Sequence, residues 1–233
     1  MTETAVGSDT QGMRRLYHSW LDAPSRLVRI VLAEKRLDAT LTLEKPWERR
    51  TDFLRLNPAG AVPVLLDGDL ALADGVAIAE YLDEAYPEPP LLGDSPDKRA
   101  EARRLVAWFM QKCGTEVTAL LVRQKLMTRF LGRGELDSAV IRAAHHNLRI
   151  HMDYIGYLAD RRHYLAGGRF TLADAAAAAH IATVDYFGDI AWDDYAAAKD
   201  WYLRVKSRPS MRGILADRIP GFAPPKHYGK QDF

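Results

Sequence analysis

Residues 56–92 constrain the fold more than any other part of this 233-residue chain. Two short apolar runs, 62–66 and 70–72, are separated by the pair Asp67-Gly68. An Asp-Gly pair between two apolar runs favours the tight turn of a β-hairpin. The segment therefore predicts two antiparallel strands joined by one short turn.

Pro63 lies within the first apolar run, and Asp74 follows the second. Because proline cannot donate to a strand ladder, Pro63 belongs at an edge or where the chain turns a peptide towards a ligand. A cis Val62-Pro63 bond would provide such a turn. Asp74 can cap a helix that has Gly75 in its first turn. We therefore expect a strand–turn–strand–helix unit.

A second unit precedes this hairpin. Residues 14–17 and 39–43 are predicted strands, and residues 25–35 between them have apolar positions at helical spacing. Arg26 and Arg29 fall on another face of that helix. Strand, helix and strand at this length form a βαβ unit. The combined order, β-α-β followed by β-β-α, predicts an α/β, thioredoxin-like domain.

Helical patterns dominate the rest of the chain. Several prolines end the first domain, and a capping box formed by Thr171 and Asp174 begins a helix that we expect to be buried. A proline- and glycine-rich tail, which we expect to be extended, ends the chain. The predicted divisions are a disordered leader at 1–12, the thioredoxin-like domain at 13–86, a linker at 87–97, an all-α domain at 98–217 and the tail at 218–233.

The composition argues against several classes of function. The net charge is +1, so neither general nucleic-acid binding nor an acidic solvating role is indicated. No apolar run approaches the roughly 20 residues that span a bilayer, and residues 1–12 lack the features of a secretory signal. A single cysteine, Cys113, excludes an internal disulfide and a multi-cysteine metal site. We expect a cytoplasmic protein that holds no metal, does not insert into membranes and does not bind nucleic acid.

Two stretches resemble one known family. LYHSWLDAPSRLVRIVLAEKRL, at residues 16–37, and the hairpin segment are similar to the cytosolic glutathione transferase superfamily. In that superfamily the peptide before a cis-proline binds the cysteinyl part of glutathione, and an acidic-serine pair binds the γ-glutamyl part. The resemblance implies these roles for Val62, Pro63 and Asp74. Because Gly75 stands where the family has serine, the implied glutathione site is vestigial.

The catalytic position is altered as well. By the same resemblance, the serine that stabilises the glutathione thiolate falls on Asp22. An ionised carboxylate accepts hydrogen bonds and repels a thiolate, so it is unsuited to that role. Ser25 is another donor near the helix N-terminus, although serine is enriched there for structural reasons. We predict no catalytic residue, with Ser25 as the alternative.

Together with the tail, the altered site resembles one branch of the superfamily, the FtsZ-binding division proteins of alphaproteobacteria. The resemblance implies a non-enzymatic, cytoplasmic homodimer at the division site that has no cofactor. It implies that the protein binds FtsZ filaments, affects filament curvature and helps drive constriction, with the tail available to a second division protein. The alternative, from a different class, is a glutathione-dependent transferase or isomerase that acts on a small electrophile.

The candidate partner-binding residues lie in three places. Trp47, beside a proline and charged residues, is either an exposed anchor or a lid over the core. Residues 98–133 carry nine Lys or Arg against two Glu, which indicates either a docking face for an acidic partner or a solvated helix face. The aromatic tail fits docking on a partner or on its own subunit. The predicted contact residues are Trp47, Arg123, Lys125, His227, Tyr228, Asp232 and Phe233.

Overall fold

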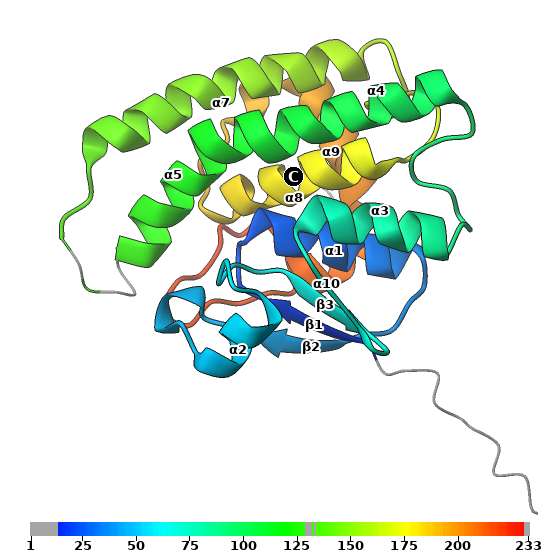
Figure 1. Ribbon diagram of the computed structural model, residues 1–233. Coiled ribbons are helices and arrows are strands. Elements are labelled where there is room, and N and C mark those ends of the chain that lie inside the picture. Colours follow the sequence, from blue (N-terminus) through cyan, green and yellow to red (C-terminus); the bar gives the residue numbers. More distant parts are fainter. Residues whose placement is uncertain (1–13, 129–131, 133, 231–233) are drawn as a thin grey trace, which may run out of the picture.

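The computed structural model describes residues 14–128, 132 and 134–230, which form two halves packed against each other (Figure 1). The first half, up to residue 86, contains a four-stranded sheet and its helices, and the second half is helical. This arrangement confirms the predicted α/β domain followed by an all-α domain. Among the described residues, no helix is both long enough and apolar enough to cross a membrane.

The sheet consists of short strands. They are β1 (Arg15–His18), β2 (Thr40–Leu43), β3 (Val64–Asp67) and β4 (Leu70–Ala73). Their spatial order is β2-β1-β3-β4, with β1 parallel to β2 and antiparallel to β3. Asp67 pairs with Leu70, so the predicted hairpin forms, but Asp67 ends β3 and the two turn residues are Gly68 and Asp69 instead of Asp67 and Gly68. β3 begins after Pro63 instead of at Val62, because a proline nitrogen cannot donate to the ladder.

Helices lie on both faces of this sheet. They are α1 (Ala23–Glu34), η1 (Pro46–Glu48), α2 (Thr51–Leu56) and α3 (Gly75–Ala85). α1 and α3 lie between the sheet and the helical half, whereas α2 lies on the opposite face (Figure 1). There Tyr17 of β1 contacts Phe53 of α2, with 5.7 Å between their ring centroids. The sequence patterns did not predict α2, which is only six residues long.

The helical half begins with one continuous helical run, α4 to η3, whose η2 and η3 parts are π-helical. The described elements of the whole helical half are α4 (Pro96–Ala107), η2 (Trp108–Thr118), α5 (Ala119–Leu121), η3 (Val122–Met127), α7 (Ser138–Ala159), α8 (Leu172–Tyr186), η4 (Trp192–Asp194), α9 (Ala196–Lys206), η5 (Pro209–Met211) and α10 (Arg212–Leu215). α7 lies on the outer side of this half, and α8 lies in its interior (Figure 1).

α8 is the centre of the helical half, and all of its residues are buried. The predicted capping box begins it. The Ala173 N–H donates to Thr171 Oγ1 at 3.2 Å, and the Thr171 N–H donates to Asp174 Oδ2 at 3.0 Å. Asp174 Oδ1 accepts from the Trp201 indole at 3.0 Å, which joins α8 to α9. The cap therefore both starts the helix and fixes its neighbour.

The tail packs on its own subunit over its described residues. Tyr228 is fully buried and makes an edge-on contact with Tyr186 of α8, with 5.0 Å between the rings. The Tyr186 hydroxyl donates to the Phe222 carbonyl at 2.8 Å and accepts from the Ile219 N–H at 2.9 Å. The structure therefore selects self-docking for residues 218–230, because α8 supplies both an aromatic surface and a hydrogen-bonding hydroxyl.

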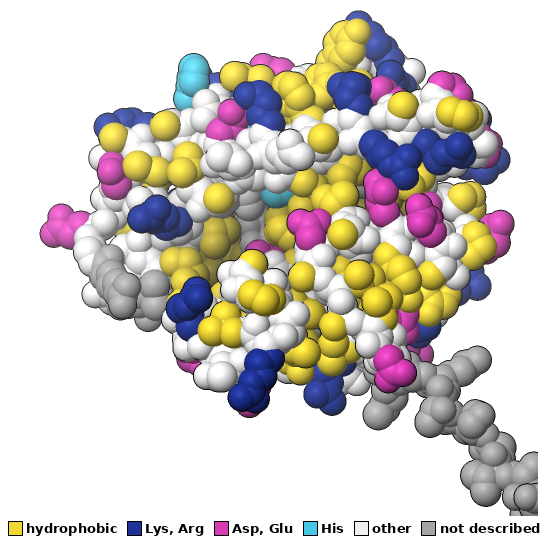
Figure 2. Space-filling view, viewed as in Figure 1, with side chains coloured by type: hydrophobic (Ala, Val, Ile, Leu, Met, Phe, Trp, Pro, Cys, Tyr) yellow, Lys and Arg dark blue, Asp and Glu magenta, His cyan; other side chains and the backbone are white. Residues whose placement is uncertain are grey.

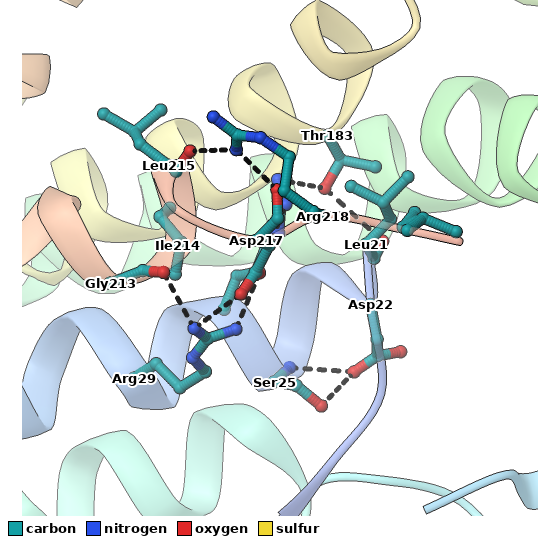
Figure 3. A network of polar contacts seen from close by, with 12 residues as sticks. Leu21, Asp22, Ser25, Arg29, Thr183, Gly213, Ile214, Leu215, Asp217 and Arg218 are labelled. Carbon is teal, nitrogen blue, oxygen red and sulfur yellow. Dashed lines mark hydrogen bonds and ion pairs between the residues drawn. The ribbon is translucent and has the colours of Figure 1, made fainter. Parts of the chain in front are cut away.

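Two arginines of α1 join the halves through Asp217. Arg29 donates to both carboxylate oxygens of Asp217, at 2.8 and 2.9 Å, and to the Gly213 carbonyl at 3.0 Å (Figure 3). Arg26 is fully buried, with Nη2 3.5 Å from Asp217 Oδ2. Arg26 and Arg29 lie on a face of α1 that the sequence predicted to be distinct from its apolar face. The C-terminal helices cover this face. A buried charge requires such a partner, because desolvation is costly.

We expect Asp217→Ala to destabilise the fold by about 3–5 kcal/mol, because the two buried guanidinium groups lose their anion. Asp52→Ala is the matched control. Asp52 is 82% exposed and pairs with Arg55 on the surface, so its loss should change the free energy of unfolding by less than about 1 kcal/mol. Urea unfolding followed by tryptophan fluorescence measures both changes. Equal effects would contradict a structural role for the Asp217 network.

Candidate functional site

A cavity of about 740 Å³ lies between the two halves, and we call it the interdomain cavity. One wall consists of residues 19–24, η1 and Val62, and the other of η2, α5, η3 and His180 of α8. Figure 2 shows the surface hollowed here, with hydrophobic side chains along the hollow. A cavity of this size can hold a small organic ligand or the side chains of a partner protein.

The residues that the resemblance assigns to glutathione lie where the fold needs them. The Val62-Pro63 bond is cis, as predicted, and Val62 lines the interdomain cavity. Asp74 is the N-cap of α3, and its carboxylate accepts from the N–H groups of Val76 and Ala77 at 2.8 and 3.0 Å. The predicted cap is confirmed. The Asp74 carboxylate already serves its own helix, and its role toward glutathione stays a prediction.

Gly75 is in contact with the start of α1. A Cβ atom at position 75 would lie 2.9 Å from both Cβ and the carbonyl oxygen of Pro24 and 3.0 Å from its Cα. Two of these three atoms are backbone atoms, so a flexible side chain cannot simply move aside. Steric exclusion by Pro24 therefore accounts for the glycine. The hydroxyl that the family places here has no space in this packing.

Asp22 and Ser25 bind each other. Asp22 is the N-cap of α1, and its carboxylate accepts from the Ser25 N–H at 2.8 Å and from the Ser25 hydroxyl at 2.6 Å (Figure 3). Ser25 is fully buried, and Asp22 lines the interdomain cavity. Burial raises the pKa of the Asp22 carboxyl to about 6, although the bonds from Ser25 lower it. The Ser25 hydroxyl, which would have to donate a hydrogen bond to a glutathione thiolate, already donates one to the Asp22 carboxylate.

His180 is a polar residue of the cavity that the sequence analysis missed. Its Nδ1 lies 2.9 Å from Thr118 Oγ1, and its Nε2 has no hydrogen-bond partner among the described residues. Burial lowers the pKa of His180 to about 3, so the ring is neutral. Nearby Cys113 is fully buried, and burial raises its pKa to about 12, so it is a thiol at neutral pH. The sequence signal that could have pointed to His180 is a lone histidine within a run of alanines.

The structure brings two of the predicted contact residues together. Half-buried Trp47 and exposed Arg123 both line the interdomain cavity, from opposite halves. Lys125 lies apart from them: its ammonium group pairs with Asp189 and lies 5.8 Å from the Phe187 ring centroid. Trp47 is thus neither fully exposed nor fully buried, and its role as a partner anchor stays a prediction.

Of the seven Lys and Arg that the structure describes between residues 98 and 128, five form ion pairs, Lys125 included. Among the described residues, Lys98, Arg103, Arg104 and Lys112 form ion pairs with Asp94, Glu80, Glu101 and Glu116. Glu101 and Glu116 lie in the same helical run, Asp94 lies just before it, and Glu80 lies in α3. The excess of basic residues along this stretch of sequence is therefore partly neutralised by acidic residues that lie close to it in the fold. Arg99 and Arg123 form no ion pair within the described residues, and Arg123 is the one that lines the interdomain cavity, so it is the stronger candidate for an acidic partner.

The predicted contact residues of the tail divide into described and undescribed positions. His227 is half-buried, with Nε2 2.8 Å from a carboxylate oxygen of Asp185. Tyr228 has no exposed surface to offer a partner, which corrects its predicted role: it anchors the tail. Asp232 and Phe233 lie outside the described residues, as does the leader at 1–12.

Comparison with known sequences identifies the family. Residues 16–90 match the glutathione S-transferase N-terminal domain, and residues 140–209 match the glutathione S-transferase C-terminal domain. The chain belongs to the glutathione S-transferase family. The two matches fall on the sheet-containing half and on the helical half, as the resemblance implied.

Several individual proteins are similar to this chain over most of its length. FtsZ-localized protein A of Caulobacter vibrioides is 47% identical over 224 residues, which cover 94% of this chain and 98% of that protein. The structure of FzlA from C. crescentus superposes with a TM-score of 0.92 at 47% identity, covering 95% of this chain and all of that one. A crystal structure of a glutathione S-transferase from Rhodospirillum rubrum F11 gives 0.93 at 51% identity, with the same coverage. A probable maleylacetoacetate isomerase of Vibrio cholerae is 29% identical over 88% of this chain and 96% of that protein.

We expect Gly75→Ser to destabilise the protein by about 1–3 kcal/mol, because the new side chain overlaps the Pro24 backbone. Gly168→Ser is the control, since a Cβ there meets no atom within 4 Å. Thermal unfolding of both variants measures the difference. Isothermal calorimetry should detect no gain of glutathione binding in Gly75→Ser. A stable variant that binds glutathione would show that only the hydroxyl is missing from the site.

We expect Asp22 to make stability depend on pH. The folded state holds its proton up to about pH 6, whereas the ordinary value is 3.8. The stability contributed by the protonated carboxyl is therefore present below the ordinary value and lost as pH rises through about 6. Relative to wild type, Asp22→Asn should gain up to about 3 kcal/mol between pH 4 and 7.

Chemical denaturation of wild type and Asp22→Asn across this pH range measures the gain. Asp52→Asn, at an exposed position, should show no such trend. A gain of the opposite sign would mean that the fold favours the ionised form of Asp22.

Proposed function

We propose that this chain is a non-enzymatic, transferase-like division protein that binds FtsZ filaments. The observation that carries the proposal is the match to FtsZ-localized protein A, which spans nearly the full length of both chains at 47% identity. A match of this length and identity extends well beyond the shared fold. We place the protein in the cytoplasm, at the division site.

The altered glutathione site supports a role without glutathione chemistry. Pro24 occupies the space beside Gly75 where the family has a hydroxyl group. Ser25 donates its hydroxyl proton to Asp22, and that carboxylate would repel a thiolate. These two changes act on different parts of glutathione, so both the binding of its γ-glutamyl part and the activation of its sulfur are weakened.

The rim of the interdomain cavity is the proposed contact with FtsZ. Trp47 supplies a large, partly exposed aromatic ring, the kind of residue that anchors protein interfaces. Arg123 supplies a charge on the opposite wall, suited to an acidic partner. The cavity between them can admit an apolar side chain of the partner.

A homodimer would present two such rims. Binding of both to one filament or to neighbouring filaments raises the effective concentration of the second contact, so weak individual contacts combine into strong attachment. Because the angle between the rims would be set by the dimer, attachment would favour one filament curvature and thereby assist constriction. We also propose that the end of the tail, which Tyr228 anchors nearby, contacts a second division protein.

A glutathione-dependent transferase or isomerase is the second candidate. The cis Val62-Pro63 bond, the acidic Asp74 and the large cavity favour it. In this case glutathione would be the cofactor and a small electrophile the substrate. Loss of one hydrogen bond to a ligand costs only about 0.5–1.5 kcal/mol, so the absent hydroxyl alone does not exclude glutathione.

Co-sedimentation with FtsZ filaments tests the first proposal. We expect the wild-type protein to sediment with filaments and Trp47→Ala or Arg123→Glu to bind about tenfold more weakly, as for interface residues worth about 1.4 kcal/mol. Arg142→Glu, at an exposed arginine of α7, is the matched control and should bind as wild type. Failure of wild type to sediment at micromolar FtsZ would overturn the proposal.

A glutathione-conjugation assay, run beside calorimetry with millimolar glutathione, separates the two candidates. We expect neither turnover nor binding heat. Turnover that is lost in Asp74→Ala, without sedimentation of the wild type, would establish the enzyme instead.

A further inference from the structure

The outer edge of the sheet at β2 is unpaired. The Thr40 N–H donates to the Arg14 carbonyl at 2.8 Å, and the Glu44 N–H donates to the His18 carbonyl at 2.8 Å. Backbone groups in a strand alternate between its two sides. The N–H and C=O groups of Leu41 and Leu43 therefore point away from β1, and no described segment pairs with them.

The two residues with unpaired backbone groups also have exposed apolar side chains. Leu41 is 46% exposed and Leu43 is 37% exposed. Proteins usually protect an edge strand with a charge, a proline or a bulge, because an open edge recruits other strands. The sequence of β2, Thr-Leu-Thr-Leu, has no charge and no proline, and its register with β1 is regular. The edge of β2 is therefore short, but no charge, proline or bulge within it protects it from pairing with another strand.

A groove of about 390 Å³ lies beside this edge. Leu41 forms one side, and Leu32 of α1 and Ile214 of α10 form other parts of its wall. A strand added to β2 would direct every second side chain toward the α1 face of the sheet. The groove can therefore receive an apolar side chain of an added strand.

The charges at the groove indicate which strand fits. Arg36 lines the groove, is exposed and forms no ion pair within the described residues. Arg29 also lines it, but Asp217 neutralises it. Asp38, on the same rim, is an exposed carboxylate that also forms no ion pair within the described residues, so an added strand has to place its acidic side chain beside Arg36 and away from Asp38. An acidic side chain is thus accommodated at Arg36, while a basic one there would meet an unpaired cation.

We propose that β2 is a docking edge for an extended, acidic segment of a partner protein, which pairs with Leu41 and Leu43 as a fifth strand. The backbone groups supply affinity, the groove accepts an apolar side chain, and Arg36 selects an acidic residue. This surface lies at the C-terminal end of α1, whereas the interdomain cavity lies at its N-terminal end. Both sites can therefore be occupied at once.

The probe is a fluorescent seven-residue peptide in which valine alternates with threonine and aspartate. Amide hydrogen exchange by NMR should show rapid exchange at Leu41 and Leu43 in the free protein, and at least tenfold slower exchange with the peptide. Fluorescence anisotropy should show at least fivefold weaker binding to Leu41→Lys and to Arg36→Glu. Leu136→Lys, at a leucine that is 56% exposed, is the control and should bind as wild type.

A peptide with lysine in place of aspartate should bind more weakly, and the difference should shrink as salt rises. No protection of Leu41 and Leu43 at millimolar peptide would overturn the proposal, as would equal binding by all variants. Protection that rises with protein concentration in the absence of peptide would also overturn it, because the edge would then pair with a second copy of this chain.

Discussion

Burial of α1 is the constraint on which the rest of the structure depends. The helix lies between the sheet and the helical half, so Arg26 and Arg29 are removed from water. Buried guanidinium groups destabilise a fold unless an anion accompanies them. Asp217, nearly two hundred residues further along the chain, supplies that anion. The position of the C-terminal helices, and of the tail that follows them, is thereby tied to the first helix.

The same helix also connects packing to function. Its N-terminus presents Pro24 to Gly75 and Asp22 to Ser25, and both contacts involve positions to which the resemblance assigns a role toward glutathione. The cis Val62-Pro63 bond and the Asp74 cap are both present, and the Asp74 carboxylate begins α3. We propose that the fold of a transferase persists here with altered contacts to glutathione. Trp47 and Arg123, which line the cavity from opposite halves, are the residues that we propose contact a partner.

Local patterns predicted the elements that depend on neighbouring residues. The Asp-Gly hairpin, the Asp74 cap and the Thr171–Asp174 capping box all act within a few residues, so each was readable from the chain. α2 was missed because six residues carry too little periodicity. The basic helical run was predicted as a charged face, but its partners lie partly on α3, which the pattern of one segment cannot reveal.

By itself, the sequence determined the order of the strands and of the longer helices of the first half, the division into a sheet-containing and a helical half, and the resemblance to glutathione transferases. These follow from periodicity, turn chemistry and short motifs, which are local. Only the tertiary structure decided that Tyr228 is an anchor, that Ser25 is engaged by Asp22, and that Gly75 leaves no room for a hydroxyl. Burial and steric exclusion depend on which distant segments come into contact, and the fold alone sets those contacts.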